Sequence, residues 1–104
     1  MTLQDLDDAL KEVCPETYEL AAPQSATRYV VWHRYGTQSS YADNRNVLGC
    51  AKVQIDIVTQ NKDDFLVDDV CAALWTMDLP YSVQSEGYDP ECNAFRTILQ
   101  LVVA

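Results

Sequence analysis

The chain of 104 residues has few of the residues from which nucleotide, metal and acyl-transfer sites are built. Its three glycines, Gly36, Gly49 and Gly87, are too scattered to form a phosphate-binding loop. Its single histidine, His33, lies inside a predicted strand and has no neighbour that would orient it as a general base. No GxSxG or HExxH motif occurs. These absences favour a protein that is not an enzyme and that needs no cofactor or metal.

Basic residues are also scarce. The chain has 7 Lys and Arg against 16 Asp and Glu, which gives a formal net charge of −9. Direct binding of nucleic acid phosphates needs Lys and Arg to displace counterions, so this balance argues against it. Three interpretations of the acidic charge stay open: solubility alone, a basic protein partner, or a surface to which passing nucleic acid does not adhere.

The four cysteines, Cys14, Cys50, Cys71 and Cys92, form no CxxC pair, and their spacing is not typical of a zinc site. Because no signal peptide is recognisable, we expect a reducing compartment and four free thiols. No apolar run approaches the ~18 residues of a membrane-spanning helix, so we do not expect a membrane partner.

The clearest secondary-structure signal is the stretch Val47–Thr59. From Ala51 to Ile57 the residues alternate between apolar and polar. A period of two is typical of a strand with one buried face and one wetter face. We therefore expect this stretch to be the central strand.

The rest of the chain predicts two amphipathic helices and further strands. Thr2 and Asp5 fit a capping box at the start of the first helix, and Pro15 ends that helix. In chain order we expect a helix over Thr2–Val13, a short strand within Glu16–Ala22, strands over Arg28–Tyr35 and Val47–Thr59, a helix over Lys62–Asp78 capped by Asn61, and strands over Tyr81–Gly87 and Ala94–Val103.

This order predicts a single α+β domain. We expect a two-layer sandwich in which a mainly antiparallel sheet of four to five strands has both helices packed on one face. The strands carry large apolar side chains on both faces, so some of them should stay uncovered. A patch of this kind generally marks a protein–protein contact. The candidate interface patch consists of Val30, Trp32, Ile98 and Val102.

Between the second and third predicted strands, Gly36–Asn46 has almost no aliphatic residue. We expect a long polar loop that reaches beyond the sheet. Its candidate contact residues for a neighbouring subunit or another partner are Tyr41, Asp43, Asn44 and Arg45.

A group of acids near the start of the second predicted helix, Asp63, Asp64 and Asp68, leaves one alternative open. Asp64 and Asp68 would share a helix face, where carboxylates can hold Mg²⁺ or Ca²⁺ weakly. The same spacing is also typical of an ordinary solvated helix face.

Several segments together resemble small tail-completion or tail-terminator proteins of long-tailed bacteriophages and prophages. They are YVVWHRYG from Tyr29, SSYADNRN from Ser39, VQIDIVTQNKDD from Val53, and LPY from Leu79 before a closing apolar strand. The likeness covers nearly the whole chain and is sharpest in YADN and IDIVT. The chain departs from the family pattern at Asp78, where the family has Gly, and in lacking a Pro before Tyr29.

The resemblance implies a structural virion protein without enzymatic activity. Members of this family form a ring, commonly a hexamer, that caps the finished tail tube at its head-proximal end and helps join it to the head. The implied partners are other copies of the chain, the tail-tube protein, and a head-completion or connector protein. DNA passes through the ring without sequence-specific binding, and assembly takes place in the cytoplasm of the bacterial host.

Two other functions stay open. An acidic decoy that binds a basic protein, such as a nuclease, would suit the net charge, although Lys and Arg are interspersed along the chain. A small metal-dependent or thiol enzyme would need a constellation of residues that the sequence does not supply.

Overall fold

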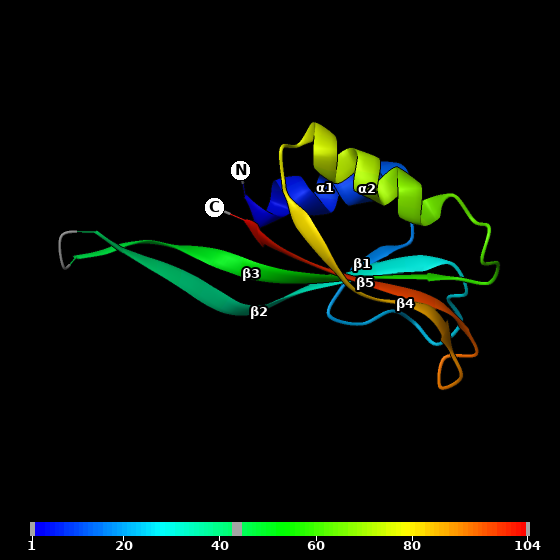
Figure 1. Ribbon diagram of the computed structural model, residues 1–104. Helices are drawn as coiled ribbons and strands as arrows, with labels where there is room; N and C mark the ends of the chain where they lie inside the picture. Colours follow the sequence, from blue (N-terminus) through cyan, green and yellow to red (C-terminus); the bar gives the residue numbers. More distant parts are fainter. Residues whose placement is uncertain (1, 43–44, 104) are drawn as a thin grey trace.

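The computed structural model describes residues 2–42 and 45–103, and the side chains of residues 38–49 lie outside that description. The elements are α1 (Leu3–Val13), β1 (Thr17–Glu19), β2 (Tyr29–Ala42), β3 (Arg45–Thr59), α2 (Leu66–Thr76), β4 (Tyr81–Asp89) and β5 (Ala94–Val103). The strands form one sheet in the order β1-β2-β3-β5-β4, in which β1 and β2 are parallel and the other pairs antiparallel. Figure 1 shows both helices on the same side of this sheet. The predicted α+β fold with a mainly antiparallel sheet is confirmed.

The centre of the core is β3. Its alternating residues Val53, Ile55 and Ile57 are fully buried, at 0% exposure. The strand register places Trp32 of β2 and Leu99 of β5 on either side of Ile55. The helices complete this core with Leu6, Leu10, Leu66, Val70 and Leu74. Burial of each large aliphatic side chain stabilises the fold by about 1.5–3 kcal/mol.

The start of α1 is capped as predicted. The Asp5 N–H donates to Thr2 Oγ1 at 3.1 Å, and the Thr2 N–H donates to Asp5 Oδ2 at 2.9 Å. This reciprocal pair satisfies two backbone N–H groups that have no intrahelical acceptor at the start of a helix.

The second helix begins later than predicted, at Leu66, with Phe65 as its N-cap. The residues before it form a turn in which Asn61 Oδ1 accepts from the Asp63 N–H and Asp64 Oδ1 accepts from the Leu66 N–H, both at 2.9 Å. Short polar side chains that bond to nearby backbone groups favour turns over helix. The prediction that Asn61 caps the helix is therefore wrong.

The stretch Gly36–Asn46 is not the predicted loop, because β2 continues to Ala42 and β3 begins at Arg45. Within the described residues, Gln38–Ala42 and Arg45–Cys50 pair with each other and with no third strand. We call this two-stranded ribbon the hairpin arm. The prediction failed because backbone hydrogen bonds across a hairpin hold such a ribbon without aliphatic side chains.

The sheet face away from the helices is more polar than predicted. On this face Arg96 forms an ion pair with Asp56 and a second one with Asp89, whose Oδ2 lies 3.3 Å from Nη1. Ile98 is half-buried and Val102 is 37% exposed on the same face. These two side chains are separated apolar groups on a mixed surface.

Val30 and Trp32 do not belong to that face. They are 0% and 4% exposed and lie in the core beneath the helices. The four residues therefore do not form one patch: Val30 and Trp32 are core residues, contrary to the prediction, whereas the interface role of Ile98 and Val102 stays a prediction. The physical reason is strand alternation, since Ile98 pairs with Asp56 and so lies on the face opposite Trp32.

The indole of Trp32 is anchored to α1. Its Nε1–H donates to Asp7 Oδ1 at 2.8 Å, and Lys11 Nζ lies 2.7 Å from Asp7 Oδ2. Asp7 is buried, and burial by itself raises the pKa of its carboxyl group. The hydrogen bonds from Lys11 and Trp32 outweigh burial, so the pKa of Asp7 lies below its ordinary value.

Replacing Asp7 by Ala should leave the indole N–H of Trp32 buried without an acceptor. An unsatisfied buried donor costs about 1–3 kcal/mol. We expect the free energy of unfolding, measured by urea denaturation, to fall by that amount. The control Glu12→Ala, at an exposed position of the same helix, should change it by less than about 0.5 kcal/mol. Equal losses in the two variants would contradict a stabilising Asp7–Trp32 hydrogen bond.

The charge on Asp7 should also make stability depend on acid pH. Its folded-state pKa lies below the unfolded value of about 3.9, so the stabilisation is present above that pH and is lost as the pH falls through the folded-state pKa. Asp7→Asn keeps an acceptor for Trp32 but carries no charge. In urea denaturation the advantage of the wild type over this variant should shrink between about pH 6 and pH 2. A constant advantage would exclude a role for the charge.

Candidate functional site

Exposed apolar side chains gather between α2 and β4. Trp75 on α2 is 83% exposed, and Tyr81 and Val83 on β4 are 36% and 51% exposed. The register places Tyr81 opposite Leu101 and Val83 opposite Leu99, so both side chains lie on the helix side of the sheet. We call the surface formed by Trp75, Tyr81 and Val83 the α2–β4 groove.

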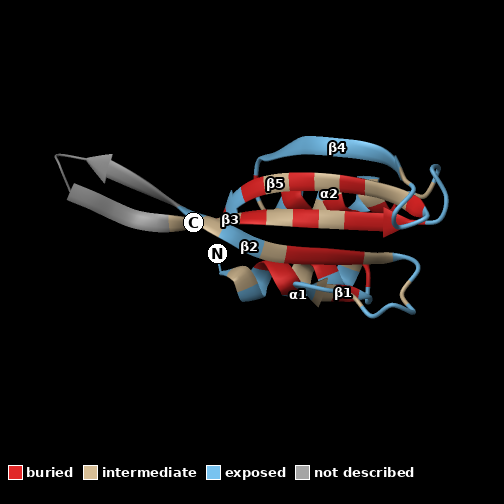
Figure 2. Ribbon diagram, turned by 90° about the horizontal axis from the view of Figure 1, so that it is seen from below, coloured by how far each residue is buried: buried red, intermediate tan, exposed pale blue. Residues whose placement is uncertain are grey.

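These side chains are exposed because β4 lies beyond the area that the helices cover. The core cluster contains residues of β2, β3 and β5 but none of β4, and Figure 2 shows β4 exposed along most of its length. Among the described residues, no strand pairs with its outer edge. An edge with free backbone N–H and C=O groups is a ready template for another chain.

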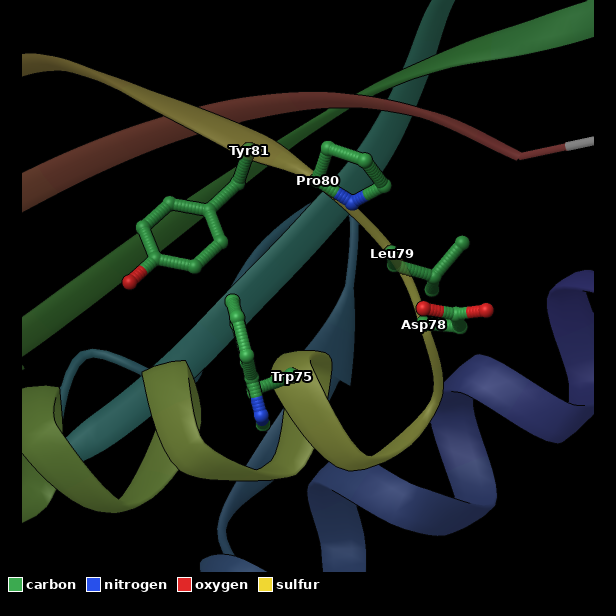
Figure 3. A pocket seen from close by; sticks show the side chains of 5 residues that line it. All are labelled: Trp75, Asp78, Leu79, Pro80 and Tyr81. Carbon is green, nitrogen blue, oxygen red and sulfur yellow. The ribbon is translucent and has the colours of Figure 1, made fainter.

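The groove is hollowed at both ends. Figure 3 shows the side chains of Trp75, from α2, and Tyr81, from β4, entering the same gap. The hollow there has a volume of about 390 Å³ and is lined by Trp75, Asp78, Leu79, Pro80 and Tyr81. A second hollow of about 420 Å³ lies toward the start of α2, where its lining includes Val67, Asp68, Glu86, Phe95 and Thr97.

A row of side chains along α2 connects the groove to the core. Val67, Cys71 and Trp75 are spaced four residues apart and so lie on one side of the helix. Val67 and Cys71 pack against the core cluster, whereas Trp75 extends past it. Contact with the Cys71 thiol raises the pKa of the Tyr81 hydroxyl. The Tyr81 side chain thus lies beside α2 (Figure 3), while 36% of it stays exposed.

The rim of the groove is acidic. Asp68, Asp78 and Glu86 are exposed and line the two hollows, where Lys62 is the basic residue. From residue 61 to residue 91 the sequence has eight Asp and Glu and one Lys. An apolar groove with such a rim fits a partner that presents apolar side chains flanked by basic ones.

The hairpin arm is the second exposed feature, and Figure 1 shows it extending beyond the helices. Two predicted interface residues lie in it: Tyr41 pairs with Asn46, and Arg45 lies beside the tip of the hairpin. Their side chains are outside those described. Asp43 and Asn44 lie outside the described residues. The roles of these four residues stay predictions.

The groove residues were not among the predicted interface residues. The available signals were Trp75, at the margin of the apolar stripe of the second helix, and the Tyr81 and Val83 alternation in a strand with a polar middle. These signals do not distinguish a strand beneath a helix from one beyond it, because the same residues suit both positions. Only the placement of α2 decides between them.

The acids near α2 do not converge on a metal site. Asp64 Oδ2 and Oδ1 accept hydrogen bonds from Arg28 at 2.7 and 3.0 Å, which lowers the pKa of Asp64. Since α2 begins at Leu66, Asp64 and Asp68 do not share a helix face, contrary to the prediction. No group of three or more His, Cys, Asp and Glu side chains in the described part of the chain is placed to hold a metal ion.

The four cysteines are free, as predicted. Among the described helices, none combines the length and the apolar character needed to span a membrane.

Comparison of the sequence with protein-family models and with curated proteins finds no match. The α2–β4 groove and the hairpin arm are therefore the features of the molecule from which a function can be inferred.

The two tryptophans should differ in fluorescence quenching. Trp75 is 83% exposed and Trp32 is 4% exposed, so iodide should quench only one of them in dilute protein. Trp75→Phe should abolish the quenchable component and change the free energy of unfolding by less than about 0.5 kcal/mol. Unchanged quenching in this variant would mean that the indole of Trp75 is not exposed in solution.

Proposed function

We propose that the chain is a structural subunit of a long-tailed bacteriophage or prophage. Copies of it close into a ring, commonly of six, that caps the completed tail tube and helps join the tail to the head connector. The starting point is the resemblance carried by YVVWHRYG, SSYADNRN and VQIDIVTQNKDD.

The observation that carries the proposal is the uncovered edge of the sheet. At β4 an exposed strand edge and the apolar side chains of the α2–β4 groove lie side by side. A small protein gains stability by burying such a surface, and a second chain is what buries it. This supports an assembly subunit in preference to a protein that acts alone.

The hairpin arm gives further support. A two-stranded ribbon outside a sheet is at best marginally stable in water. Contact with a neighbouring molecule would stabilise it by covering its faces and strand edges. A subunit with a protruding ribbon and an uncovered edge strand has two different surfaces, which is what a ring of repeated contacts requires.

The acidic charge is compatible with a channel for DNA. Six copies at −9 each carry a formal charge of about −54. Within a Debye length of about 8 Å at physiological salt, negative walls repel the phosphate backbone. DNA would then move through the ring without adhering to it.

Sedimentation of the purified chain tests the proposal. We expect a species of about 70 kDa, six times 11.7 kDa, that dissociates on dilution. Trp75→Ala should weaken association about 30-fold, because removing a large interface aromatic typically costs about 2 kcal/mol. The matched control is Phe65→Ala, which removes an aromatic that is 73% exposed but does not line the groove, and it should associate like the wild type.

Electron microscopy of open-ended tail tubes mixed with the protein gives the second measurement. We expect a ring at one end of each tube with wild-type protein and bare ends with Trp75→Ala. A chain that stays monomeric at all concentrations, leaves tubes bare and instead binds a basic nuclease would contradict the proposal and favour the acidic decoy.

A further inference from the structure

The hollow at the C-terminal end of α2 has two aromatic walls that do not stack on each other. Figure 3 shows the side chains of Trp75 and Tyr81 entering it from α2 and β4. The close ring pairs among the described aromatic side chains are elsewhere: His33 with Tyr35, and Tyr88 with Phe95. Neither wall of the hollow therefore covers the other, and the Trp75 indole, at 83% exposure, is open to a ligand.

Asp78 is the charged residue in the lining of this hollow, and its position is unfavourable for an acid. It follows the C-cap Met77 and has φ 61°, in the left-handed region where glycine is favoured. The last turn of α2 has no basic residue, so the negative end of the helix dipole repels a carboxylate there. Two separate effects thus disfavour an acid at residue 78.

The backbone at this point is held by the end of the helix. The Asp78 N–H donates to Trp75 O at 3.0 Å, and the Leu79 N–H donates to Leu74 O at 2.9 Å. This pair of bonds is the Schellman pattern, which requires a left-handed residue at the position of Asp78. The conformation of Asp78 is therefore imposed by the helix end and not by a contact of its carboxylate.

No ion pair in the described part of the chain compensates for this cost. The four pairs formed among the described side chains do not include Asp78, which is exposed. None of the residues that line the hollow is basic. A residue that disfavours the fold on two counts and has no charged partner there is typical of a binding position.

Two aromatic rings and a carboxylate match one chemical group, the guanidinium of arginine. It is planar and cationic, it stacks on the faces of aromatic rings, and it donates paired hydrogen bonds to a carboxylate. The ammonium of lysine is more strongly hydrated and has no flat face to stack. Asp68 and Glu86, which are exposed at the neighbouring hollow, add negative charge that attracts a cation from a distance.

A peptide chain is the carrier of arginine that this place favours. The outer edge of β4, which begins at Tyr81, pairs with no strand among the described residues. An extended segment can form backbone hydrogen bonds with such an edge while one of its side chains enters the hollow beside it. A free small molecule gains no such backbone pairing.

We propose that Trp75, Asp78 and Tyr81 form a binding site for an arginine side chain of a second protein chain. The guanidinium lies between the two rings, and its N–H groups donate to the Asp78 carboxylate. The inference goes beyond the proposed function, because the site belongs to a single copy whether or not a ring forms. In the proposed ring, the chain that covers the groove would present the arginine.

Titration with short peptides tests the site. The probe is a blocked five-residue peptide with arginine at its centre, and the matched peptide has citrulline there, which keeps the shape without the charge. In dilute protein, where the proposed ring is dissociated, the arginine peptide should bind about fivefold more tightly. It should shift the NMR signal of the Trp75 indole N–H and leave that of the buried Trp32 unchanged.

A change of one atom group at residue 78 isolates the charge. Asp78→Asn keeps a residue that tolerates the left-handed region, and it should lower the affinity for the arginine peptide about fivefold, to that of the citrulline peptide. The control Asp69→Asn removes the same charge from an exposed position of α2 that lines neither hollow. The control should bind the arginine peptide like the wild type.

Asp78→Gly separates a binding role from a structural one. Glycine relieves the left-handed strain and removes the charge at the helix end, so the midpoint of thermal unfolding should rise by about 3 °C. The same variant should lose its preference for the arginine peptide. A lower midpoint, or equal affinity of the wild type for the arginine and citrulline peptides, would overturn the site.

The outcome for this site is separable from the outcome for the ring. If the wild type prefers the arginine peptide but forms no ring in solution or on tail tubes, the proposed function fails and the site stands. If a ring forms while Asp78→Asn binds the arginine peptide like the wild type, the site is overturned and the proposed function stands.

Discussion

Burial of one face of β3 beneath both helices is the constraint on which the rest of the structure depends. Val53, Ile55 and Ile57 have no solvent exposure, and their alternation with polar neighbours determines which face of the sheet the helices cover. Through the strand register this choice also places Trp32 and Leu99 in the core. A shift of one residue would expose every one of these side chains.

Two small helices do not cover a sheet of five strands. They cover the central strands and leave β4 outside, with Tyr81 and Val83 on the side that a wider helical layer would bury. The uncovered edge and the groove beside it follow from this mismatch in width. An edge strand of this kind favours pairing with another molecule unless it is protected, and for this reason we interpret the molecule as a subunit.

Much of the fold could be predicted from local patterns. The period of two in β3 and β5, the capping box at Thr2 and the proline after α1 act over a few residues and give the same result in any context. The hairpin arm was not predicted because it depends on an interaction between two segments of the chain. The backbone of Gln38–Ala42 pairs with that of Arg45–Cys50, and this pairing makes both segments strands. A count of aliphatic residues within one segment does not reveal such a pairing. The later start of α2 has a local cause, since Asn61 and Asp64 accept hydrogen bonds from nearby backbone N–H groups in the turn before it.

The sequence by itself determined the fold class, the order of the strands along the chain and the acidic net charge, because these depend on local periodicity and composition. Only the tertiary structure decided which apolar side chains remain exposed. The same strand residues suit a covered and an uncovered position, and the extent and placement of the helical layer select between them. Trp32 is therefore a core residue held by Asp7, and Trp75 is the tryptophan that faces solvent.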